Sequence, residues 1–395
     1  MAYIYHIPSW WPSGKMKQNG VYIYELLKNI ALSDKSHYHT VAVFNTSLKW
    51  ISFKHFFRDL IALNKKDIPK TFESIDNINL LEIPRVIGMN LKTGVNYISK
   101  LVEQNIRTIQ SLHRKPDLIH VHVSYPGMII GYQLSKHFNI PFMLTEHSSR
   151  FPDNRFELFG VDQIYLKKVF DHSKKNIAVS SFLADKFTPY HVTPDVIHNF
   201  VNWDRPLIDA AHSNKTTFSF IWIGRMNDRV KRLDILLNAL KILISKGVQC
   251  TCTLIGDGEL LPYYQSLATQ LGVDASMIWV GYASSSEIQS YLGNAHCLVI
   301  SSESETFGIA AIEALSYGIP VLTTACGGVE EIIDASCGLI VEKNNPDALA
   351  IGMQWMMDHA DHFNHKQIQD YCYENFDRHS IAEKYVSIYK SIIRA

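Results

Sequence analysis

The chain has no excess of charge of either sign, because 38 basic residues balance 38 acidic ones over 395 residues. This balance gives no electrostatic reason to expect a nucleic acid as a partner. Hydrophobic residues make up 47% of the chain and charged residues 19%, which is the composition of an ordinary globular protein. At this length, two domains are the default expectation.

Cysteine is scarce, and its spacing gives no support to a metal centre. The six cysteines include no Cys-x-x-Cys pair, and no other ligands cluster around the closest two, Cys250 and Cys252. These two belong to an apolar run that predicts a strand, so they would share one face of a sheet. We therefore expect reduced, structural cysteines in a cytoplasmic protein, and no metal site.

Long apolar runs are missing as well. No run reaches eighteen residues, and the first residues, MAYIYHIPSWWPSGK, lack the basic and apolar regions of a signal peptide. The basic and aromatic segment at residues 47–66 has two interpretations. It is either an amphipathic helix lying on the inner face of a membrane, or a helix whose aromatic face packs on the first domain.

Short apolar runs alternate with amphipathic helical patterns in both halves of the chain. The predicted strands lie at residues 3–9, 38–44, 116–123, 141–147, 175–180, 218–225, 250–258, 278–283, 297–302 and 320–325. Such an alternation is typical of parallel sheets that are covered on both faces, and it is interrupted at residues 196–206. The sequence therefore predicts an α/β fold with two Rossmann-like, doubly wound domains that face a cleft.

Ligands of doubly wound sheets bind beyond the carboxyl ends of the strands, so residues at those positions are the candidates for a site in the first domain. Asn19-Gly20 opens a predicted helix, where it is either a phosphate-binding turn or an ordinary turn and cap. His147 follows a strand and could exchange a proton near neutral pH. His120 and His122 share one face of a predicted strand, and we interpret them as structural.

Two cations follow the first strand of the second domain. Arg225 lies at the strand end, and Lys231 lies just before the next helical pattern. They form either a diphosphate-binding turn or a solvated basic turn. The nearby Gly256-x-Gly258 is interpreted as a turn, because Leu261 stands where a dinucleotide motif requires a third glycine.

The stretch ESETFGIAAIEAL places two carboxylates around a predicted helix start. Glu305 precedes the helix and Glu313 lies in its second turn, separated by roughly 10 Å along the axis. The free backbone N–H groups at Phe307, Gly308 and Ile309 lie between them, where a diphosphate would bind. The spacing suits one elongated ligand, although two solvated glutamates are the simpler alternative.

These residues resemble those of the retaining family-4 glycosyltransferases with the GT-B fold. The resemblance is strongest over residues 218–342 and is carried by the E-x7-E element with its FG and by the preceding GR…K pair. The last residues resemble the family's C-terminal helix, which crosses back onto the first domain. The expected domains are therefore residues 1–199 with 376–395, which would bind the acceptor, and residues 200–375, which would bind the donor.

The resemblance implies a role for each residue of the donor site. Arg225 and Lys231 would bind the diphosphate of a nucleotide sugar, and Glu313 would hold the ribose hydroxyls. Glu305 would contact the transferred sugar. The base would stack near Tyr282, mostly on the backbone.

In the first domain, the family implies that Gly20 lets the chain close over the phosphates and that His147 lies near the reacting sugar. The reaction would move a sugar to a hydroxyl of a glycan or a lipid-linked acceptor with retained configuration. It would need no cofactor and no metal, and the sequence contains no Asp-x-Asp. Three alternatives stay open, namely a sugar-nucleotide epimerase, a glycoside hydrolase and a non-catalytic sugar-nucleotide-binding protein.

Overall fold

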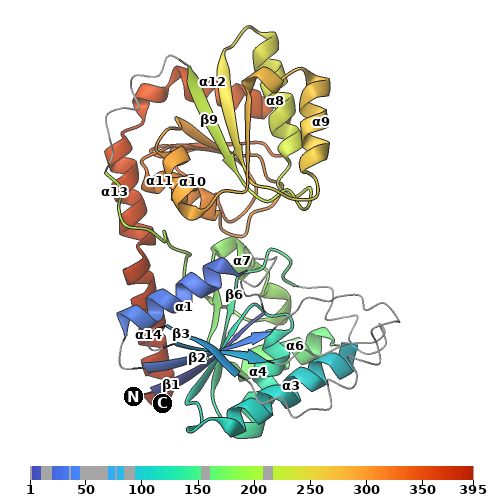
Figure 1. The fold of residues 1–395 in the computed structure, drawn as a ribbon, viewed down its shortest axis with the longest axis vertical. Coiled ribbons are helices and arrows are strands. Elements are labelled where there is room, and N and C mark those ends of the chain that lie inside the picture. Colours follow the sequence, from blue (N-terminus) through green and yellow to red (C-terminus); the bar gives the residue numbers. More distant parts are fainter. Residues whose placement is uncertain are drawn as a thin grey trace. The chain divides into compact units, whose positions relative to one another are not determined.

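The structure is a computed structural model that describes residues 2–9, 20–34, 37–44, 70–75, 78–83, 94–152, 161–207 and 217–394. The chain forms two units, each with its own sheet (Figure 1). The first unit comprises Met1–Val179, Leu183–Ile197 and Arg378–Ala395, and the second comprises Ser180–Phe182 and His198–Asp377. The chain thus changes unit at 179/180, 182/183, 197/198 and 377/378. The sequence prediction has only two such changes, at 199/200 and 375/376.

The first unit is built on a sheet with the strand order β3-β4-β2-β1-β5-β6-β7-β8. Its strands are β1 (Ala2–Pro8), β2 (His37–Phe44), β3 (Lys70–Ile75), β4 (Ile78–Ile83), β5 (Leu118–His122), β6 (Phe142–Glu146), β7 (Asn176–Ala178) and β8 (Asp195–Val196). All neighbours are parallel except the hairpin of β3 and β4, which is antiparallel. The order reverses between β1 and β5.

Helices cover both faces of this sheet. The helices of this unit are α1 (Val21–Ser33), α3 (Gly94–Ser111), α4 (Gly127–Phe138), α6 (Gln163–His172), the short helix η3 (Thr188–Tyr190) and α14 (Arg378–Arg394). Helix α7 (Ser181–Asp185) is divided, because Ser181 and Phe182 belong to the second unit. Figure 1 shows α1 and α14 together on one side and α3, α4 and α6 on the other. The last helix of the chain therefore contributes to the core of the first unit, as the sequence predicts.

The second unit has a six-stranded parallel sheet with the order β11-β10-β9-β12-β13-β14. Its strands are β9 (Phe218–Ile223), β10 (Cys250–Ile255), β11 (Met277–Gly281), β12 (Cys297–Ile300), β13 (Val321–Thr324) and β14 (Gly338–Val341). Counted from β9, this is the order 3-2-1-4-5-6 of dinucleotide-binding sheets. The order reverses between β9 and β12, so that rule places a ligand beyond the carboxyl ends of these two strands.

The helices of the second unit are α8 (Leu233–Ser245), α9 (Leu261–Leu271), α10 (Ser285–Leu292), α11 (Ile309–Ser316), α12 (Pro346–Asp358) and α13 (His365–Phe376), with short helices η5 (Asp274–Ser276) and η6 (Ala360–His362). Figure 1 shows α8 and α9 on one side of the sheet and α10 and α11 on the other. Local signals account for several of their ends. Ser284 and Glu287 form a reciprocal capping box at α10, and Asn345 caps α12 directly before a proline.

The predicted two-unit, doubly wound α/β architecture is confirmed, and every strand predicted from the sequence is present. The hairpin of β3 and β4 and the strands β8 and β14 were not predicted from the sequence. All six cysteines are buried and unpaired, and Cys250 and Cys252 lie buried on the same face of β10.

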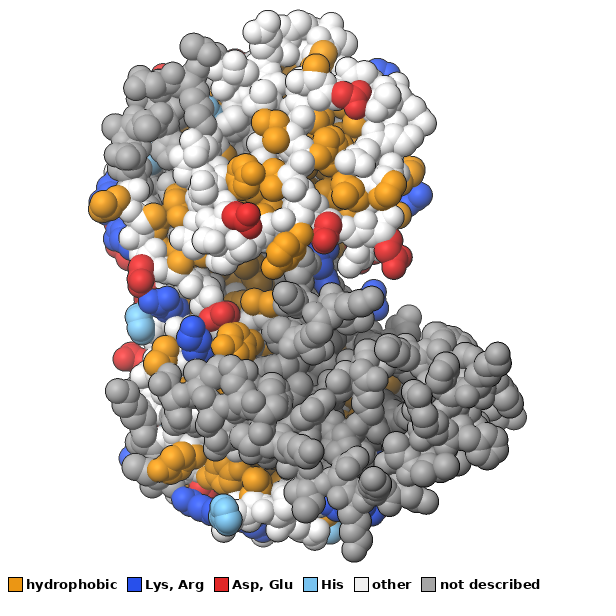
Figure 2. Space-filling view, in the orientation of Figure 1, with side chains coloured by type: hydrophobic (Ala, Val, Ile, Leu, Met, Phe, Trp, Pro, Cys, Tyr) orange, Lys and Arg blue, Asp and Glu red, His pale blue; other side chains and the backbone are white. Residues whose placement is uncertain are grey.

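On the face of the second unit that Figure 2 presents, charged side chains of both signs stand among apolar ones, in keeping with the neutral net charge. Within the described ranges, no helix combines the length and the apolar character that crossing a bilayer requires. The segment at residues 47–66 lies outside the described residues, so neither of its interpretations is tested.

Candidate active site

The predicted donor residues of the second unit follow the strands at which the sheet order reverses. The loop of residues 224–232 connects β9 to α8, and the loop of residues 301–308 connects β12 to α11. Because β9 and β12 are neighbouring parallel strands, both loops leave the sheet at the same edge. The topology therefore brings together residues that lie about 80 positions apart in the sequence.

Lys231 and Glu305 form an ion pair between these two loops. The Lys231 Nζ atom donates a hydrogen bond to Glu305 Oε1 at 2.6 Å, and both side chains are partly shielded from water. The hydroxyl of Ser302 donates to the same carboxylate oxygen at 2.6 Å. Glu305 is therefore held by two donors, one charged and one neutral, before any ligand binds.

The backbone of Glu305 is fixed as well. Its N–H donates to the carbonyl of Cys326 at 2.7 Å, and its carbonyl accepts from the N–H of Gly328 at 2.8 Å. These bonds form an isolated bridge between Glu305 and Gly327. The sequence placed Glu305 just before a helix and gave no sign of Ser302 or of this bridge.

Helix α11 begins where the sequence predicts it, after Gly308. This glycine is the N-cap, with φ of 99°, a left-handed conformation that favours glycine. A Cβ atom there would lie 2.9 Å from Cγ2 of Val329, so space as well as conformation selects glycine. Phe307 is buried beside it, and Ile309 starts the helix with partial exposure.

Glu313 lies in the second turn of α11, flanked by the buried Ile312 and Ala314. Its side chain keeps partial exposure, yet desolvation raises the pKa of its carboxyl to about 8. Among the described residues no side chain or backbone group donates a hydrogen bond to this carboxylate. This shift counts against the alternative of a simply solvated glutamate, and Glu313 is a shielded acceptor that an incoming hydroxyl could satisfy.

The other donor residues lie at the ends of β9 and β11. Arg225 is exposed two residues beyond β9, and Tyr282 follows β11 with 54% of its side chain exposed. An exposed tyrosine beside the sheet edge offers an aromatic face for a base. Glu303, the third glutamate of the 301–308 loop, is exposed.

In the first unit, Gly20 is the N-cap of α1, with φ of 71°. His147 follows β6, and both of its ring nitrogens are buried without a hydrogen-bond partner in the part of the chain that the structure describes. Its ring stacks on His122 and lies near Tyr22 of α1. Burial lowers the pKa of His147 to about 3, so the imidazole is neutral near neutral pH.

Glu146 is a buried residue of this region that the sequence analysis missed. One carboxylate oxygen accepts from the N–H groups of His147 and Ser148 at 2.9 and 2.7 Å, and the other accepts from the N–H and hydroxyl of Ser124. Burial still raises the pKa of this carboxyl. Glu146 therefore ties the loop after β5 to the loop that carries His147. Its position at the end of an apolar strand was a signal that could have identified it.

Comparison with known proteins gives the family. Residues 204–371 match the model of glycosyl transferases group 1, and residues 59–205 match the model of glycosyltransferase family 4. The chain is a group 1, family 4 glycosyltransferase. An uncharacterized glycosyltransferase of Methanocaldococcus jannaschii is 24% identical to it over 82% of this chain and 87% of that relative.

Solved glycosyltransferase structures share the fold. The sucrose-phosphate synthase of Thermosynechococcus elongatus superposes with a TM-score of 0.77 at 18% identity, covering 100% of each chain. The Anabaena protein Alr3699/HepE superposes with a TM-score of 0.69 at 17% identity, and the match covers 99% of this chain and 100% of the Anabaena chain. These likenesses confirm the predicted GT-B fold.

Proposed function

We propose that this glycosyltransferase moves a sugar from a nucleoside-diphosphate sugar to an acceptor hydroxyl with retention of the anomeric configuration. The observation that carries the proposal is the group of residues at the reversal of the second sheet. There a lysine, an arginine and a helix N-terminus follow the ends of β9 and β12, where they would surround a leaving diphosphate. Two carboxylates, Glu305 and Glu313, stand on either side of that helix end.

The chemistry follows from the charge that develops on the leaving diphosphate. Arg225, Lys231 and the N–H groups at the start of α11 would stabilise this charge without proton transfer. Lys231 is paired with Glu305 before the donor binds. A donor phosphate would share the ammonium group with Glu305, which would orient that carboxylate toward the transferred sugar. No metal is needed for this role.

The remaining residues would position the donor and the acceptor. The unpartnered carboxylate of Glu313 would accept the ribose hydroxyls, and Tyr282 would lie near the base. Gly20 would let the first unit approach the phosphates, and His147 would hydrogen-bond the reacting sugar as a neutral ring. Retention would follow from front-face attack, with the leaving phosphate assisting deprotonation of the acceptor.

The known proteins support a nucleotide-sugar donor. The Anabaena structure contains UDP and glucose. The acceptor is proposed as a hydroxyl of a glycan or of a lipid-linked molecule. The family matches name transferases, and no observation favours an epimerase, a hydrolase or a non-catalytic protein.

Weak association with anionic membranes through residues 47–66 belongs to the same proposal. Its basis is the sequence alone, in which aromatic and basic residues alternate over this segment. Co-sedimentation with anionic liposomes at low salt tests it directly. Protein that stays in the supernatant under these conditions would rule the association out.

The donor can be identified with a thermal-shift panel of UDP, GDP, ADP and TDP sugars. A ligand that binds the native state raises its unfolding midpoint, so base and sugar emerge from one experiment. No shift with any member at millimolar concentration would count against the donor site. The test does not depend on knowing the acceptor.

A double variant then tests the residues. Arg225→Ala with Lys231→Ala should lower turnover by at least ~100-fold, on the scale of lost electrostatic stabilisation. Lys246→Ala, at the exposed C-terminal end of α8, is the matched control for loss of a cation and should keep full turnover. Unchanged turnover in the double variant would refute the assignment.

A further inference from the structure

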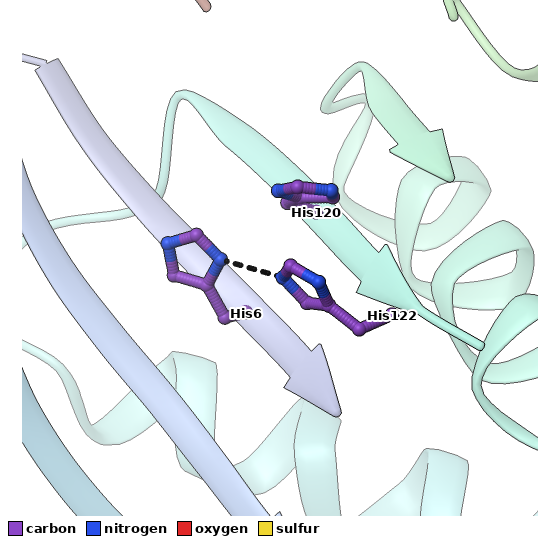
Figure 3. Close-up of side chains that lie close together, drawn as sticks. All are labelled: His6, His120 and His122. Atoms are coloured by element: carbon purple, nitrogen blue, oxygen red, sulfur yellow. Dashed lines mark hydrogen bonds between the residues drawn. The ribbon is translucent and has the colours of Figure 1, made fainter. Parts of the chain in front are cut away.

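Three histidines converge in the core of the first unit, at the reversal of its sheet. His6 on β1 is the register partner of His120 on β5, and His122 follows two residues later on the same face. All three are fully buried. Figure 3 shows their rings on one side of the two strands, with His6 and His122 facing each other.

The distances between the rings suit a metal ion. Nδ1 of His6 and Nε2 of His122 are 3.3 Å apart. With metal–nitrogen bonds of about 2.0–2.1 Å, a tetrahedral zinc ion holds its ligand nitrogens about 3.3–3.4 Å apart. One nitrogen from each of the three rings lies within 4.8 Å of the others, so a small movement of the rings would complete the set.

Outer partners already orient two of the rings. Nε2 of His6 lies 2.9 Å from Nδ1 of His39, and the two nitrogens of His120 lie 2.7 Å from the Tyr389 hydroxyl and 2.8 Å from the Thr145 hydroxyl. Metal-binding histidines typically have such a partner on the nitrogen that does not bind the metal. Whichever nitrogen His120 used, one hydroxyl would remain as its outer partner.

Hydrogen bonding does not use the full capacity of this cluster. Three neutral rings in the chain His39–His6–His122 have three N–H groups and three lone pairs, and their two mutual hydrogen bonds use two of each. Nε2 of His39 and Nδ1 of His122 have no other partner within the described ranges. Whichever ring donates in each of these two hydrogen bonds, one nitrogen lone pair is left unused.

We propose that His6, His120 and His122 bind one transition-metal ion of the zinc type. Imidazole nitrogens are ligands that Zn²⁺, Cu²⁺ and Ni²⁺ share, and three of them leave one tetrahedral position for an oxygen. The hydroxyls of Thr145 and Tyr389 lie beside His120, and either of them could supply this oxygen ligand. A water molecule could supply it as well. A deprotonated oxygen there would offset part of the ion's charge, so binding should release protons.

The ion would stabilise the packing of the last helix. Tyr385 and Tyr389 of α14 lie against the ring of His120, and both are buried. Because the cluster has no exposed atoms, we expect the ion to enter while α14 is unpacked, most simply during folding. Exchange from the native protein should then be slow.

The experiment measures metal in the full-length chain after unfolding in guanidinium with a chelator and refolding with or without equimolar Zn²⁺. We expect about one zinc per chain that survives gel filtration, together with a raised unfolding midpoint. Refolding with Co²⁺ should give the intense visible absorption of a tetrahedral site. Less than a tenth of an ion per chain, or a weak octahedral cobalt spectrum, would overturn the proposal.

Variants locate the ion. His122→Gln should reduce bound zinc to background, whereas His113→Gln, which replaces an exposed histidine of the same unit, should retain it. Equal zinc in both variants would show binding elsewhere and would overturn the site. If His122→Gln does not refold, the cobalt spectrum of the unmodified chain decides alone. A histidine site gives intense tetrahedral bands in the visible region without the near-ultraviolet charge-transfer band of a cobalt–thiolate bond, and the presence of that band would overturn the site.

Discussion

At the scale of single residues, the donor site contains two glutamates in opposite surroundings. Glu305 is held by the Lys231 ammonium group and the Ser302 hydroxyl. Glu313 is shielded, has a pKa raised to about 8, and receives no hydrogen bond from the residues that the structure describes. The first is organised before the donor arrives, and the second gains its hydrogen bonds only when a ligand brings hydroxyl groups.

The raised pKa of Glu313 predicts that donor binding depends on pH. If ribose hydroxyls bind the ionised carboxylate, binding must remove a proton at any pH below about 8. Affinity for the nucleotide sugar should therefore rise with pH up to that value, by at most ~10-fold per unit. Calorimetry with an intact nucleotide sugar between pH 6.5 and 9 measures this dependence.

Glu313→Gln is the control for this prediction, because it keeps the shape and removes the ionisation. It should bind the donor more weakly than the parent and with no dependence on pH in this range. A flat profile in the parent protein would contradict the proposed role of Glu313.

Ser302 is predicted to be a positioning residue, because it acts through Glu305. A hydrogen bond to a charged group contributes about 1.5–3 kcal/mol, so Ser302→Ala should lower kcat roughly 10- to 100-fold. KM for the donor should change less, since the diphosphate contacts remain. Steady-state kinetics checks this split, with Ser245→Ala at the end of α8 as a control. A raised KM with an unchanged kcat would argue against the role of Ser302 in positioning Glu305.

At the scale of elements, the start of α11 depends on one glycine. Gly308 combines a left-handed backbone with a close neighbour, Val329, whereas Gly247 has a similar φ of 80° and no neighbour within 4 Å. The two positions therefore separate the conformational cost of a side chain from its steric cost. A displaced Gly308 would also move the N–H groups that are proposed to bind the diphosphate.

Gly308→Ala should destabilise the protein more than Gly247→Ala. The left-handed conformation costs roughly 1–2 kcal/mol for alanine, and this cost is common to both variants. The contact with Val329 adds to it only at Gly308. Urea unfolding followed by circular dichroism measures both free energies of unfolding. Equal losses in the two variants would show that the helix start can shift without strain.

The strands and most helices were predictable because their apolar periodicity is local. The sequence placed Arg225 at a strand end, Lys231 and Glu305 just before helices, and Glu313 in the second turn of a helix. The reversal between β9 and β12 comes instead from pairings between strands that are distant in the chain. The bond from Ser302 to Glu305 requires a bend in the loop that no periodicity encodes. The cluster of His6 with His120 and His122 was missed for a similar reason, since β1 and β5 lie more than 100 residues apart.

At the scale of the whole molecule, the first unit needs the last helix of the chain. Ile381, Tyr385 and Tyr389 of α14 are buried in this unit, and α14 packs along α1. Burying a large side chain contributes about 1.5–3 kcal/mol, so these contacts are a substantial part of the unit's stability. The second unit ends at Asp377 and does not include α14.

Truncation after Asp377 should therefore separate the two units functionally. The shortened chain should lose transfer activity and show a lower unfolding midpoint for the first unit. Its affinity for the nucleotide sugar should stay within about threefold, because distant independent sites are nearly additive. Calorimetry and denaturation of the same preparation test both statements. Loss of donor binding would show that the second unit depends on α14.

The division of the first unit between distant segments of the chain also bears on its synthesis. The ribosome makes Arg378–Ala395 after the whole of the second unit, whereas the strands of the first unit are made before it. The face of the first sheet that carries the histidines therefore stays without α14 until the second unit has been made. The unit whose strands are synthesised first is thus completed after the other one.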